Sequence, residues 1–143
     1  ILVRYYLKHE ELPELGRAVM ISPPNQGSEL VDLWSEVPVY GSLNGPAGYQ
    51  LGTDSESLPI KLGPADFEVG VIAGTNTTNP LFSLMIPGED DGKVSVERTR
   101  LEGMTDFLVV PAAHSLIMRD SAVMQQVVHF LANGQFLRTP DEP

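Results

Sequence analysis

Three short apolar runs, each of strand length, predict the framework of the chain. Residues 17–22, 67–74 and 105–110 are mostly apolar and are bounded by turn residues, which is typical of strands buried on both faces of a parallel sheet. Helical patterns cover residues 1–11, 94–100 and 121–133. Because strands alternate with helices, the sequence predicts an α/β protein with right-handed crossovers and about three parallel strands.

The last helix has the clearest boundaries. Asp120 is a predicted N-cap, and Gly134 is placed to stop the helix at its C-terminal end. Pro111 is expected to end the preceding strand. The predicted apolar stripe of the helix consists of Val123, Met124, Val127, Val128 and Leu131.

Residues 23–65 read as a loop-rich, lid-like insertion. Frequent glycine and proline allow only short elements here, such as a helix over residues 29–35 with Ser28 as its cap. Long loops within compact domains often serve function. Trp34 and Tyr40 could line a substrate site or simply anchor the loop, and the sequence does not decide between these roles.

The composition argues against nucleic acids, membranes and thiolate-bound metals as partners of the chain. The 143 residues are 42% hydrophobic and carry a net charge of -10, so the chain lacks the basic character that nucleic acids and anionic membranes attract. No apolar run approaches the ~20 residues of a transmembrane helix, so we expect a soluble protein of the bacterial cytoplasm or periplasm. The absence of cysteine excludes disulfides and thiolate metal sites and leaves the redox compartment open.

Two loops carry the candidate chemistry. Glu89, Asp90 and Asp91 follow the second predicted strand, and His114 follows the third. Parallel strands end at the same sheet edge, so an acid and a histidine meet there, as a serine hydrolase requires. The alternatives are a solvated acidic turn and a histidine that only packs or caps. A calcium site formed by the three acids does not have EF-hand spacing.

Four segments together resemble lipase-like α/β-hydrolases. Residues 90–96 (DDGKVSV) resemble the acid loop of that family, residues 111–115 (PAAHS) its histidine loop, residues 21–28 (ISPPNQGS) the segment after its sixth strand, and residues 2–7 (LVRYYL) the helix after its nucleophile elbow. The resemblance implies that residues 1–143 are one C-terminal segment of a partial α/β-hydrolase fold. It also implies a serine ester hydrolase with an acyl-ester or lipid substrate and no cofactor or metal. His114 is then the catalytic base, and Asp91 its acid, with Asp90 as the runner-up.

The sequence contains no G-x-S-x-G motif, which is the elbow that carries the nucleophile in this family. We therefore expect the serine upstream of residue 1 in a longer parent protein, and we expect the isolated chain to be inactive. The alternative is a catalytically inactive fragment that acts as an interaction or binding module. The strand at residues 17–22 is expected to form an open apolar edge, which predicts a homodimer through that edge.

Overall fold

The computed structural model describes residues 1–35, 45, 47–78 and 80–138. Residues 36–44 and 46 of the predicted insertion at 23–65, Tyr40 among them, lie outside the described residues. The centre of the fold is one parallel sheet with the strand order β1-β2-β3. Its strands are β1 (Ala18–Ile21), β2 (Val69–Asn76) and β3 (Asp106–Ala113). The predicted α/β class with three parallel strands is confirmed.

The strand β3 continues past the residue that was expected to end it. Pro111 lies within β3, and the strand reaches Ala113. A proline cannot donate to a neighbouring strand, but β3 lies at the edge of the sheet, where that loss is tolerated. The Pro111 carbonyl accepts a 2.8 Å hydrogen bond from the Asn76 side chain. The extension carries the backbone directly to His114.

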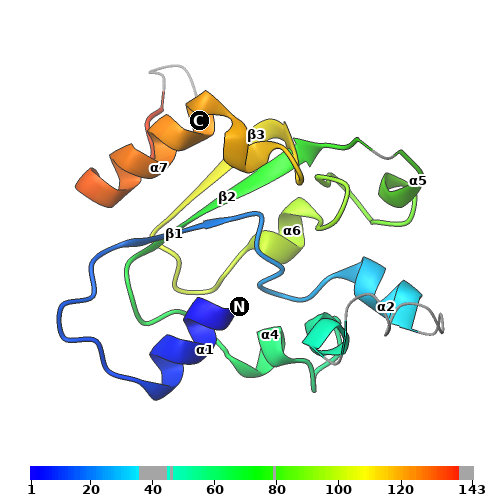
Figure 1. Ribbon diagram of the computed structural model, residues 1–143, viewed down its shortest axis with the longest axis horizontal. Coiled ribbons are helices and arrows are strands. Elements are labelled where there is room, and N and C mark those ends of the chain that lie inside the picture. Colours follow the sequence, from blue (N-terminus) through cyan, green and yellow to red (C-terminus); the bar gives the residue numbers. More distant parts are fainter. Residues whose placement is uncertain (36–44, 46, 79, 139–143) are drawn as a thin grey trace.

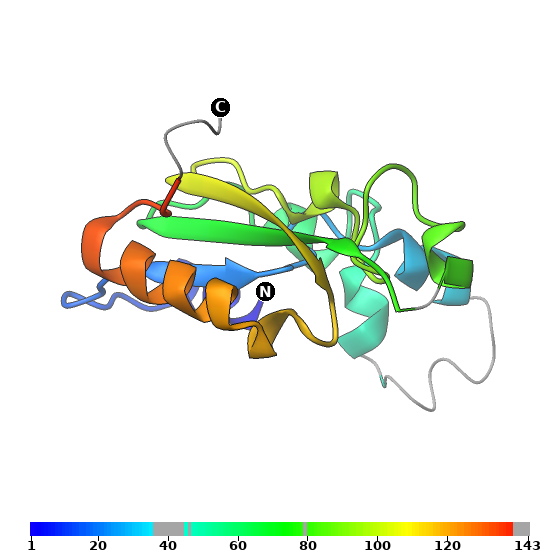
Figure 2. The same ribbon diagram turned by 90° about the horizontal axis from the view of Figure 1, so that it is seen from above.

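Each face of the sheet has its own apolar core. The helix α7 (Ser121–Asn133) covers one face, and the opposite face packs against the segment that leads into β3. Figures 1 and 2 show α7 on one side of the strands and α1, α4 and α6 on the other. Gly70 on β2 lets the rings of Phe130 and Phe136 approach, because a Cβ atom there would lie 2.7 Å from each ring.

The ends of α7 agree with their prediction, but its apolar stripe does not. Asp120 Oδ1 accepts hydrogen bonds from the amides of Ala122 and Val123, and Gly134 ends the helix with a φ of 76°. The helix buries Val123 and Phe130. The predicted stripe members that remain exposed are Met124, Val128 and Leu131. The helix is therefore rotated toward Phe130, a residue that the stripe omitted.

The helix α1 (Leu2–His9) buries an arginine rather than its apolar residues. Arg4 donates to two oxygens of Asn25, at 3.0 and 3.2 Å, and to the carbonyls of Pro59 and Gly63, at 3.0 and 2.7 Å. Pro59 belongs to α4 (Leu58–Lys61). Burial lowers the pKa of Arg4, but the four uncharged acceptors replace the hydration that the guanidinium loses.

The remaining short elements gather near the carboxyl ends of the strands (Figure 1). They are α2 (Glu29–Ser35), η1 (Tyr49–Leu51), α5 (Pro80–Ser83), α6 (Val96–Thr99) and η2 (Ile117–Arg119). The Trp34 ring meets Phe82 edge-on at 5.6 Å, so α2 and α5 contact each other. In the part of the chain described, no helix is long and apolar enough to cross a membrane.

Candidate active site

The structure brings Asp91 and His114 together at the edge where β2 and β3 end. Asp91 Oδ2 lies 2.7 Å from His114 Nδ1. The backbones are joined too, because the His114 amide donates to the Asp91 carbonyl at 2.9 Å. The Asp91 side chain is fully buried, whereas the His114 side chain is 27% exposed. The acid is thus held inside the protein, and the imidazole reaches toward the surface.

The second oxygen of Asp91 is fixed by its own loop. Asp91 Oδ1 accepts hydrogen bonds from the amides of Lys93, at 3.0 Å, and Val94, at 2.9 Å. Burial acts to raise the pKa of Asp91, but the hydrogen bonds from His114 and Val94, the charge of His114 and the nearby Ser22 hydroxyl outweigh it. The pKa of Asp91 is therefore lowered, and the carboxylate stays ionised at neutral pH.

The ionised acid determines which imidazole nitrogen carries the proton. A carboxylate only accepts hydrogen bonds, so Nδ1 of His114 must be the donor to Asp91. In the neutral ring, Nε2 then has the free lone pair. Within the described residues, Nε2 makes no hydrogen bond. This arrangement suits a general base that is oriented by a carboxylate.

Two glycines allow the acid loop to lie against the end of β2. A Cβ atom at Gly74 would come within 2.3 Å of the Ala112 carbonyl oxygen and 2.9 Å of Asp91 Cβ. Gly92 has a φ of +93°, and a Cβ there would meet Thr77 Oγ1 at 2.6 Å. The space next to β2 is therefore filled by the acid loop and the backbone before His114.

Asp90 has other partners. Its carboxylate accepts from Ser83 Oγ at 2.6 Å and from the Gly92 amide at 2.7 Å. These contacts tie α5 to the acid loop and close the turn at Gly92. Of the two adjacent acids, Asp91 is the one that the structure places on His114.

Two serines near this site were not predicted to contact the acid loop. Ser22, directly after β1, has a φ of 44° and a buried hydroxyl without a hydrogen-bond partner in the described residues. The hydroxyl lies near enough to Asp91 to lower its pKa without hydrogen-bonding geometry. Ser28, predicted as a cap of α2, donates its hydroxyl to the Lys93 carbonyl instead, at 3.0 Å. Neither the position of Ser22 near Asp91 nor the bond from Ser28 to Lys93 could be predicted from neighbouring residues in the sequence.

The described residues contain no group of three or more His, Asp or Glu side chains that could hold a metal ion. The acid loop is closed by its own amides and by His114.

No protein family model matches the chain, and no curated protein matches it. Two solved structures resemble it, both of the Bacillus licheniformis lipase BlEst2. The propeptide form has a TM-score of 0.59 and 19% identity over 99% of this chain and 34% of the lipase. The mature form has a TM-score of 0.53 and 18% identity over 79% of this chain and 51% of the lipase.

The chain has a lipase-like α/β fold. At these identities the likeness concerns the fold alone, and the chain spans about half or less of each lipase structure.

Proposed function

We propose that this chain is the acid–base part of a serine ester hydrolase, with its nucleophile on a serine N-terminal to residue 1. The observation that carries the proposal is the buried, ionised Asp91 bound to Nδ1 of a partly exposed His114. In the described part of the chain, no hydrogen bond joins His114 to a serine hydroxyl. The lipase-like fold, shared over part of a lipase's length, supports the reaction class. The chain order Ser, acid, His of α/β-hydrolases supports a serine N-terminal to Asp91.

The proposed reaction uses Nε2 of His114 twice. As the serine attacks the ester carbonyl, Nε2 takes the hydroxyl proton, and it then donates that proton to the departing alcohol. Water hydrolyses the acyl-enzyme by the same transfers in reverse order. Asp91 keeps the ring in the correct tautomer and stabilises the imidazolium that forms in each step.

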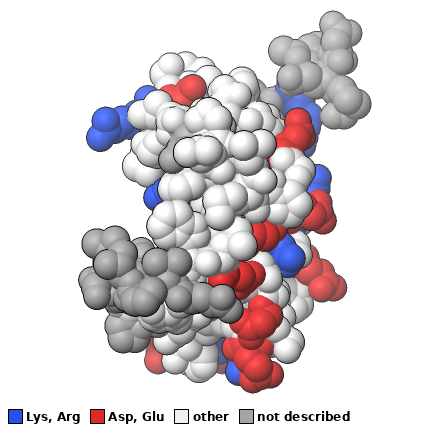
Figure 3. All heavy atoms as spheres, turned by 90° about the vertical axis from the view of Figure 1, so that its right-hand side faces the viewer, with Lys and Arg blue, Asp and Glu red and all other residues white. Residues whose placement is uncertain are grey.

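The surface around this edge suits a neutral, apolar substrate. Leu81 and Leu84, in and after α5, are 71% and 84% exposed. Figure 3 shows this side of the molecule, with a broad uncharged area beside a row of mostly acidic side chains that has a few Lys and Arg among them. An open groove of about 600 Å³ at this edge is lined by the ends of β2 and β3, by Leu116 and by Asp120, but not by His114. An acyl ester fits these surfaces better than an anionic substrate, because the acidic row would repel anions.

The test uses the full-length protein that carries these residues and a short-chain nitrophenyl ester. We expect His114→Ala and Asp91→Asn each to lower kcat by about 10⁴-fold. His9→Ala is the matched control, since His9 lies exposed on α1, and it should retain full activity. Activity that survives both site substitutions would overturn the proposal, because other groups would then perform the catalysis. Absence of activity in the unaltered full-length protein would favour the binding module instead.

A further inference from the structure

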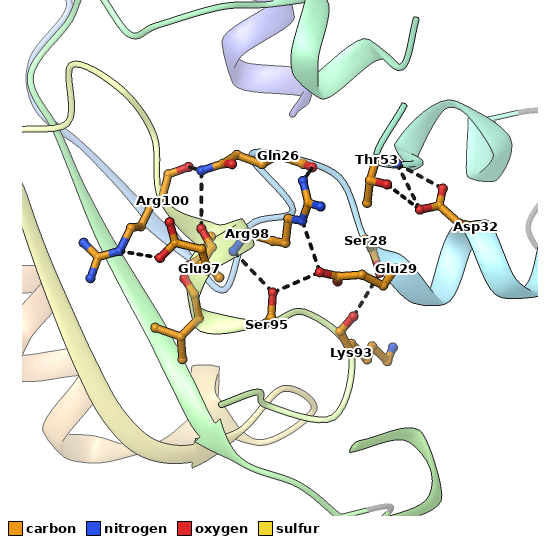
Figure 4. A network of polar contacts seen from close by, with 12 residues as sticks. Gln26, Ser28, Glu29, Asp32, Thr53, Lys93, Ser95, Glu97, Arg98 and Arg100 are labelled. Carbon is orange, nitrogen blue, oxygen red and sulfur yellow. Dashed lines mark hydrogen bonds and ion pairs between the residues drawn. The ribbon is translucent and has the colours of Figure 1, made fainter. Parts of the chain in front are cut away.

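The segment after β1 is bound to the acid loop by a network of polar contacts, shown in Figure 4. Ser28 Oγ donates to the Lys93 carbonyl at 3.0 Å, although the two residues are 65 positions apart. The next residue, Glu29, accepts from Arg98 Nε at 3.1 Å and from Ser95 Oγ at 3.2 Å. The start of α2 is thereby held against the start of α6.

The Ser28 contact acts on the peptide group that binds the acid. The carbonyl of Lys93 and the amide of Val94 belong to one peptide unit. Its oxygen accepts from Ser28, and its N–H donates to Asp91 Oδ1 at 2.9 Å. A hydrogen bond to the oxygen fixes the orientation of this unit and strengthens the N–H as a donor, because bonds in a chain polarise one another.

Glu29 in turn keeps Ser28 in place. Its side chain is 15% exposed and binds through Oε1, while Oε2 is buried without a hydrogen-bond partner in the described residues. Arg98 also donates to the Gln26 carbonyl at 3.2 Å, so the residues on both sides of Ser28 are bound to one arginine. This clamp, formed by Glu29, Arg98 and Ser95, leaves the Ser28 backbone little freedom to move away from Lys93.

We propose that Ser28 is a positioning residue of the active site, which orients the Lys93–Val94 peptide so that it holds Asp91 toward His114, and that Glu29 supports it through Arg98 and Ser95. This inference rests on the proposed function, because the roles of Asp91 and His114 give the positioning its purpose. In this role Ser28 acts through the Lys93–Val94 peptide and Asp91 alone.

The test is an NMR titration of the 143-residue chain with ¹³C-labelled aspartate side chains. Loss of the Ser28 hydroxyl weakens the Val94 donor, so Ser28→Ala should raise the pKa of Asp91 by about half a pH unit. Ser35→Ala is the matched control, because the Ser35 hydroxyl also donates to a backbone carbonyl, that of Asp32 at 2.8 Å, away from the acid loop. It should leave the pKa of Asp91 unchanged.

Equal pKa values of Asp91 in Ser28→Ala and the unaltered chain would overturn the inference, as would an equal rise in the Ser35→Ala control. If Ser28→Ala does not fold, Glu29→Gln decides in the same way, since it weakens the clamp without removing its bulk. The nitrophenyl ester assay of His114→Ala is independent of these outcomes. A failure of the Ser28 inference is thus distinguishable from a failure of the proposed function.

Discussion

Substitution of Gly74 by alanine tests the close packing of β2 against the acid loop. The added Cβ would lie 2.3 Å from the Ala112 carbonyl oxygen, about 0.7 Å inside the 3.0 Å that real Cβ contacts observe. The neighbour is backbone of β3, which cannot rotate away like the end of a flexible side chain. Asp91 Cβ, at 2.9 Å, blocks a second direction of relief.

Overpacking of this kind costs about 1–3 kcal/mol, and we expect the upper half of that range because both neighbours are constrained. Urea denaturation of the 143-residue chain measures the change in the free energy of unfolding. Gly16→Ala is the control, since a Cβ there meets nothing within 4 Å. It should leave stability unchanged or raise it slightly.

A second readout follows the site itself. Relief of the clash must move β3 or the acid loop, so the ¹H–¹⁵N signal of His114 Nδ1 should broaden or vanish in Gly74→Ala and persist in Gly16→Ala. If both variants unfold at the same urea concentration and both keep the His114 signal, the packing of β2 against the acid loop is not as tight as the Gly74 contacts indicate.

Two further predictions concern acid stability and association. The pKa values of Asp91 and Asp106 are lowered in the folded state, because in each case hydrogen bonds and nearby positive charge outweigh burial. The stability that these two carboxylates contribute is therefore present above the ordinary carboxyl pKa of about 4. It is lost as the pH falls through their folded pKa values. The free energy of unfolding should thus decrease from about pH 5 to about pH 3, and it should decrease less steeply in Asp91→Asn. Urea denaturation at each pH measures this, and an equal decrease in the two proteins would contradict it. The strand β1 has a partner on one side only among the described strands, so we propose that its open edge pairs with a second copy of the chain. Light scattering should report a dimer at micromolar concentrations, and a uniform monomer would argue against the pairing.

Locally encoded features were predicted well from the sequence. The caps of α7 at Asp120 and Gly134 depend on neighbouring residues, and the helix over residues 29–35 has the predicted bounds. The contact between Asp91 and His114 was also foreseeable, because parallel strands bring their carboxyl ends to one edge.

The features that depend on tertiary context could not be predicted in this way. Continuation of β3 through Pro111 requires knowing that β3 is an edge strand. The buried face of α7 depends on the missing side chain at Gly70, which lets the Phe130 ring approach β2. The bond from Ser28 to Lys93 joins residues 65 positions apart, and a serine before a helix is more commonly a cap.

The burial of Arg4 limits how this fold can be recombined with its relatives. Its four hydrogen bonds go to acceptors on Asn25, Pro59 and Gly63, and Asn25 itself donates to the Thr99 carbonyl at 2.8 Å. A planar guanidinium reaches these divergent oxygens, whereas a lysine ammonium is a single point of charge. In a chimera, α1 must therefore be exchanged together with the turn after β1 and with α4, because a foreign helix inserted alone would leave several carbonyls buried without a donor.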